Sequence, residues 1–174
     1  FAVGDPRYNI PATSDYREGA VFVFFGRAVL QNLTTEESSM RIRSEWLLTD
    51  SDDSFGISIG KSVQGMNSLI GDYNNDGIPE LLIGAKKFGA NHGSAFIWLG
   101  SASYQNNPDW RNYETATFWF VPPSSKGYWG DQVAWMGDVN GDGYSDFCVG
   151  DYAWDGLYGG TASNPYRGRV TIFY

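Results

Sequence analysis

The sequence DYNNDGIPE at residues 72–80 has a near copy, DVNGDGYSD, at residues 138–146. Both follow the pattern D-x-N-x-D-G-x-x-[DE], which places oxygen-bearing side chains at positions 1, 3, 5 and 9 and a glycine at position 6. Ca²⁺ takes about six to eight oxygen ligands, and alternate positions of such a loop turn their side chains inward. The glycine permits the sharp turn that returns position 9 to the ion. The repeated pattern therefore predicts two calcium loops rather than two acidic turns.

Each loop offers four side chains and one main-chain carbonyl as expected ligands. These are Asp72, Asn74, Asp76, Glu80 and the Ile78 carbonyl in the first loop, and Asp138, Asn140, Asp142, Asp146 and the Tyr144 carbonyl in the second. Without a cation, the three carboxylates of a loop repel one another, so the free energy of Ca²⁺ binding should become folding free energy. A closed oxygen cage leaves no position for a substrate, which indicates a structural rather than a catalytic ion.

The sequence around the loops argues against an EF-hand. An EF-hand requires a bidentate Glu at loop position 12 and a helix on each side, whereas position 12 here is Ile83 or Val149. Both loops run into short apolar, β-prone segments at 81–83 and 147–149. A strand, a metal loop and a second strand are the better interpretation.

The loops belong to a longer repeat. The strand-like segment GAVFVFFG at 19–26 recurs as GSAFIWLG at 93–100 and as GRVTIFY at 168–174. A fourth apolar segment closes the unit, at 42–48 in one copy and at 115–121 in another. Short strands in repeating groups of four are typical of β-propeller blades. The predicted fold is all-β, a propeller of four-stranded antiparallel blades.

The framing residues of the repeat resemble the FG-GAP repeats of the integrin α-subunit propeller. An aromatic-glycine pair precedes each metal loop, and a glycine-containing tripeptide follows it. The pairs are Phe55-Gly56 and Trp129-Gly130. The tripeptides are Gly84-Ala85-Lys86, Gly150-Asp151-Tyr152 and, in an earlier copy, Gly4-Asp5-Pro6. This chain departs from the family in having Trp129 for phenylalanine and a proline only in the first tripeptide. The resemblance implies calcium-binding blades, cell adhesion, and a place outside the cell, at its surface or in the lumen of the secretory pathway.

The repeat divides the chain into about two and a half blades. Residues 1–54 are expected to end a preceding blade and add a linker, 55–128 to form one complete FG-GAP blade, and 129–174 to begin the next. A propeller closes its ring with more blades than these. The remaining blades are expected from the same or a neighbouring chain.

Composition narrows the classes of partner. A net charge of −8 and a pI near 4.5 argue against nucleic-acid binding. No apolar run is long enough to predict membrane insertion in this segment.

His92 is the only histidine, so a Ser-His-Asp site is not expected and the chain is predicted not to be an enzyme. The lone Cys148 is expected to be a buried free thiol, and Asn32 begins a glycosylation sequon.

Three functions fit these features. The first is a calcium-stabilised recognition module that binds a protein through the loops 5–18, 85–92 and 151–167. The second is a carbohydrate-binding or enzyme-appended propeller that binds a glycan through aromatic residues outside the strands, which are Trp110, Trp154, Tyr158 and Tyr166. The third is a structural bead of a surface filament or coat.

Overall fold

The computed structural model describes residues 2–5, 8, 19–24, 34, 38, 40–43, 55–59, 71–101, 110–122, 128–154 and 167–174. Within these ranges the regular structure is almost entirely β, with one short helix, α1 (Phe88–Asn91), and one 3-10 turn, η3 (Tyr113–Thr115). The predicted all-β class is confirmed. No helix in the described part of the chain has the length and apolar character needed to cross a membrane.

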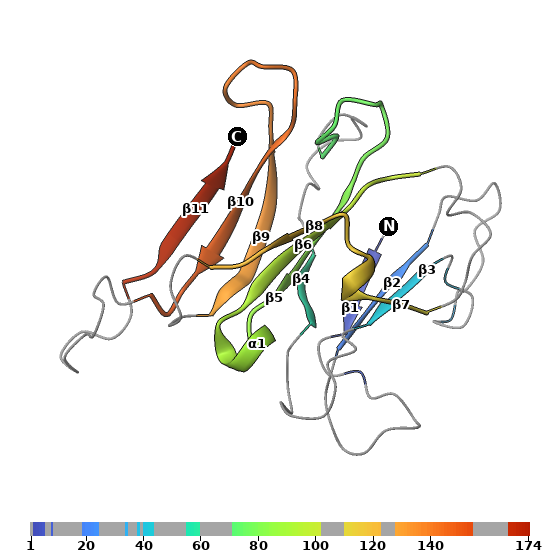
Figure 1. Ribbon diagram of the computed structural model, residues 1–174, viewed down its shortest axis with the longest axis vertical. Coiled ribbons are helices and arrows are strands. Elements are labelled where there is room, and N and C mark those ends of the chain that lie inside the picture. Colours follow the sequence, from blue (N-terminus) through green and yellow to red (C-terminus); the bar gives the residue numbers. More distant parts are fainter. Residues whose placement is uncertain are drawn as a thin grey trace.

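The strands form three sheets that stand next to one another (Figure 1). The first contains β1 (Ala2–Asp5), β2 (Ala20–Val23), β3 (Met40–Arg43) and β7 (Trp110–Asn112). The second contains β4 (Phe55–Ile59), β5 (Leu81–Ala85), β6 (Ser94–Trp98) and β8 (Phe118–Phe120). The third contains β9 (Trp129–Gly137), β10 (Asp146–Asp151) and β11 (Arg169–Phe173).

The second sheet is an antiparallel meander in which neighbouring strands follow chain order, β4-β5-β6-β8. Its fourth strand lies inside the segment 115–121 that the repeat predicts for it. The third sheet has the order β9-β10-β11, and β1, β2 and β3 are likewise sequential. These sheets are consistent with a partial propeller. The number of blades and their boundaries stay predictions.

The first sheet has one feature that the repeat does not predict. Strand β7 lies within the range 55–128 assigned to the middle unit, yet it pairs in parallel with β3. A segment of one predicted unit therefore extends the sheet of the preceding unit.

The two central strands of the second sheet, β5 and β6, are buried on both faces, which explains their continuous apolar runs. Ile83, Phe96 and Trp98 pack with residues of β2 and β3 in one core cluster. The alternate residues Leu82 and Ile97 pack with residues of β9 and β10 in a second cluster. Because successive side chains of a strand point to opposite faces, β5 and β6 each contribute to two cores.

The aromatic-glycine pair Trp129-Gly130 lies where the second and third sheets meet. Trp129 is fully buried, and it forms a parallel bridge with Gly93. A Cβ on Gly130 would collide with the main-chain carbonyl of Ser94, and Gly130 has a φ of 86°. Glycine is needed here both for the left-handed backbone and for the close approach of two main chains.

We predict that Gly130→Ala strongly destabilises the protein. Alanine in the left-handed region costs about 1–2 kcal/mol, and the collision with Ser94 adds about 1–3 kcal/mol of overpacking. Gly89→Ala is the matched control, since Gly89 has a φ of 64° and open space around the Cβ position. Chemical denaturation should show the larger loss for Gly130→Ala, and equal losses would contradict this account of the interface.

Candidate metal site

The two predicted calcium loops lie side by side. The segment 71–80 leads into β5, and the segment 138–145 joins β9 to β10. Figure 1 shows both at one edge of the molecule, opposite the end that carries α1. The main chain of Ser145 in the second loop donates to the carbonyl of Asp72 in the first, at 3.1 Å.

The first loop is folded by its own side-chain oxygens. The Asp72 carboxylate accepts the N–H groups of Asp76, at 3.0 Å, and Gly77, at 2.8 Å. Asn74 Oδ1 accepts the Asp76 N–H at 3.1 Å, and Asp76 Oδ1 accepts the Ile78 N–H at 2.8 Å. These bonds turn the side chains at positions 1, 3 and 5 toward the inside of the loop, as the spacing predicts.

Glu80 closes the first loop. Its carboxylate accepts the N–H groups of Tyr73 and Gly100. One oxygen each from Asp72, Asp76 and Glu80 lie within 4.8 Å of one another. Among the described residues, no other three acidic, histidine or cysteine ligands are gathered so closely.

The environment of Glu80 penalises its charge. Burial raises the pKa of this carboxyl, the hydrogen bonds from Tyr73 and Gly100 lower it, and the charges of Asp72 and Asp76 raise it further. The net direction is upward, so the anionic form is disfavoured in the absence of a cation. A divalent ion among these oxygens would reverse that balance.

The second loop repeats these hydrogen bonds position by position. The Asp138 carboxylate accepts the N–H groups of Asp142, at 3.0 Å, and Gly143, at 2.8 Å. Asp142 Oδ1 accepts the Tyr144 N–H at 2.9 Å, and Asn140 Oδ1 accepts the Asp142 N–H at 2.9 Å. The loop does not repeat the close approach of three carboxylates seen in the first.

Asp146, at position 9 of the second loop, has an environment that the loop spacing does not predict. The residue is 1% exposed, and its Oδ2 accepts the Val139 N–H at 2.8 Å. Its Oδ1 is buried and has no hydrogen-bond partner. An unsatisfied buried carboxylate oxygen is costly. The donor set of the loop, all oxygen, fits a hard cation that would satisfy this atom.

The other predicted contact residues are placed only in part. Trp110 begins β7. The ring of Trp154 lies over the Arg169 guanidinium, with 5.2 Å from Cζ to the ring centroid. Tyr158, Tyr166 and Asn32 lie outside the described residues. Cys148 is partly buried on β10, where burial raises its thiol pKa.

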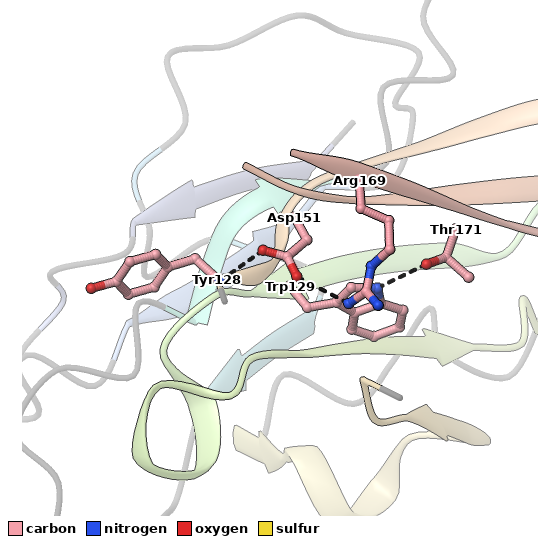
Figure 2. Close-up of polar contacts among 5 residues, drawn as sticks. All are labelled: Tyr128, Trp129, Asp151, Arg169 and Thr171. Atoms are coloured by element: carbon pink, nitrogen blue, oxygen red, sulfur yellow. Dashed lines mark hydrogen bonds and ion pairs between the residues drawn. The ribbon is translucent and has the colours of Figure 1, made fainter. Parts of the chain in front are cut away.

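A second polar cluster was not predicted from the sequence (Figure 2). Asp151 is buried and accepts the Tyr128 N–H at 3.0 Å, and it forms an ion pair with Arg169 at 3.0 Å. Trp129 Nε1 donates to Thr171 Oγ1 at 3.3 Å. These contacts hold the start of β9 against β10 and β11. The one sequence feature that could have indicated this cluster is that Asp5 and Asp151 occupy the same position of the repeat.

No family model matches the chain. Over 117 residues, 63% of this chain, it is 30% identical to integrin alpha-8 of Mus musculus. The match spans 10% of that protein's length, so the chain corresponds to about a tenth of it. The similarity agrees with the resemblance drawn from the repeat without establishing membership of the family.

We predict that Asp142→Ala lowers the thermal midpoint in calcium and has little effect in chelator. An ion at about one hundred times its dissociation constant stabilises by about 2.7 kcal/mol, which corresponds to about 5–10 °C for a chain of this size. Asp131→Ala is the control, because Asp131 is an acidic residue outside the loops that pairs with Lys86 at 3.1 Å. Equal midpoints for Asp142→Ala and the parent in saturating calcium would contradict a structural ion.

Proposed function

We propose that this chain is part of a calcium-stabilised β-propeller recognition module that binds another protein. Each loop takes one Ca²⁺. The ligands are Asp72, Asn74, Asp76, Glu80 and the Ile78 carbonyl in the first site, and Asp138, Asn140, Asp142, Asp146 and the Tyr144 carbonyl in the second. The observation that carries the proposal is the unpartnered, buried Oδ1 of Asp146 inside a loop whose twin gathers three carboxylates.

The donor set supports calcium over other ions. The proposed ligands are carboxylate, amide and carbonyl oxygens without histidine or cysteine, which disfavours zinc and copper. Magnesium demands a stricter octahedral geometry and retains its waters, whereas Ca²⁺ accepts variable cages of protein oxygens. Two adjacent loops with the same internal hydrogen bonds are suited to the more tolerant ion.

The ions act on stability rather than on chemistry. Their ligands close hairpins, because Glu80 and Asp146 each return to the second residue of their own loop. We propose that the described blades have no catalytic activity of their own, since the clustered carboxylates are committed to the two loops. A module of this kind works where calcium is abundant, outside the cell or in the secretory pathway.

The choice of a protein partner rests on the similarity to integrin alpha-8, whose name places it among integrin subunits. Recognition is assigned to the loops because a scaffold of packed strands holds its connections at the surface. At the end opposite the metal loops, Tyr152 is half-exposed and stacks on Tyr128 at 5.3 Å, with Lys86 Nζ 5.9 Å from the centre of its ring. Tyrosine and other aromatic residues are enriched at protein interfaces.

The test is calcium-dependent binding to a panel of extracellular proteins, with a glycan array run in parallel. We predict that the chain binds a protein in calcium, that chelator abolishes this binding, and that Tyr152→Ala weakens it without changing the thermal midpoint. Ile172→Ala is the control, because Ile172 is an exposed apolar residue of β11 whose partner on β10 is Cys148, four residues before Tyr152. Binding confined to glycans, or binding indifferent to calcium, would contradict the proposal.

A further inference from the structure

The two loops share a buried serine bridge. Gly71 N–H donates to Ser145 Oγ at 3.2 Å, and Ser145 N–H donates to the Asp72 carbonyl at 3.1 Å. Ser145 and Asp72 are each 4% exposed. Ser145 belongs to the second loop and the other two residues to the first, so two hydrogen bonds join loops from neighbouring sheets in a site screened from water.

The bridge adjoins proposed ligands on both sides. Asp72 is the position-1 ligand of the first loop, and Ser145 directly precedes Asp146, the position-9 ligand of the second. The carbonyl of Gly71 also accepts the Glu80 N–H at 2.8 Å. A shift at the start of the first loop therefore moves the chain segment that carries the last ligand of the second.

An aromatic contact runs parallel to the bridge. Tyr73 donates its N–H to Glu80 and packs its ring edge-on against Phe147, with centroids 6.0 Å apart. The Tyr73 ring also lies 6.3 Å from that of Trp135. A Cβ on Gly71 would come within 3.0 Å of Trp135 Nε1. The main chain at the start of the first loop therefore packs directly against Trp135 of the third sheet.

We propose that Ca²⁺ binding at either loop raises the affinity of the other, with Ser145 as the positioning residue that couples them; this rests on the proposed function. Without ions, carboxylate repulsion loosens each loop. The first ion orders its own loop and, through the bridge, the adjoining ligand of its neighbour. The second ion then loses less conformational freedom on binding. By linkage, the two loops affect each other by the same factor.

The experiment is calorimetric titration of the full chain with Ca²⁺ after chelator treatment. The parent should bind with a Hill coefficient greater than one. Asp76→Asn and Asp142→Asn disable one loop each, and each should weaken the remaining site by about fivefold or more, the lower range of allosteric couplings, and by the same factor. This reciprocity tests the proposal even if a substitution at Ser145 fails to fold.

Ser145→Ala removes Oγ, and with it one of the two hydrogen bonds of the bridge, so the Hill coefficient should fall toward one while the number of ions bound stays the same. Ser94→Ala is the matched control, because Ser94, like Ser145, is a buried serine whose Oγ accepts a hydrogen bond. The donor is Trp119 Nε1 at 3.2 Å, away from the loops. It should retain the cooperativity of the parent. A purely structural role for Ser145 would lower stability in both variants and leave the Hill coefficient unchanged, which overturns the coupling.

The outcomes separate this inference from the proposed function. Two ions that bind independently, with each site unaffected by loss of the other, would overturn the coupling and leave the calcium loops intact. A parent that binds no Ca²⁺ in these loops would overturn both.

Discussion

The two loops at one edge of this molecule bury carboxylates, and the packing around them depends on how the charge of those carboxylates is balanced. Two loops turn their acidic side chains inward, and the ends of the loops are buried at Asp72, Glu80 and Asp146. Main-chain N–H groups offset part of the cost, yet the pKa of Glu80 is still raised and Asp146 Oδ1 has no partner. A cation would supply what the hydrogen bonds do not, namely an opposite charge for these buried atoms.

The loops occur in neighbouring sheets whose cores depend on each other. Strands β5 and β6 pack one face against β2 and β3 and the other against β9 and β10. The backbones of the second and third sheets meet at Gly130 and Gly93, where a side chain would force them apart. Loosening one hairpin would therefore expose apolar surface belonging to two sheets, so an ion that pinned a hairpin would stabilise both.

Much of this arrangement is predictable from the sequence because it is periodic. The loop spacing predicted which side chains turn inward, and the hydrogen bonds of residues 72–80 and 138–146 follow it. The recurring apolar segments predicted the strands β5, β6 and β8. Calcium itself, its carbonyl ligands and the blade boundaries stay predictions.

Contacts between units were not predictable, because a repeat describes each copy and not its neighbour. Ser145 is not a predicted ligand of its own loop, and the packing of two sheets brings it to Gly71. The parallel pairing of β7 with β3 is likewise a contact between predicted units, which the repeat does not describe. The four-residue helix α1 is too short to produce a helical period.

The most direct test is a crystal structure of the chain grown in calcium, with anomalous differences recorded at a long wavelength. The account predicts two peaks, one in each loop, each with oxygen ligands at about 2.3–2.6 Å. Asp146 Oδ1 should be among the ligands of the second ion. Loops without anomalous density at millimolar calcium, with Asp146 Oδ1 bonded instead to a water or a protein donor, would contradict the account.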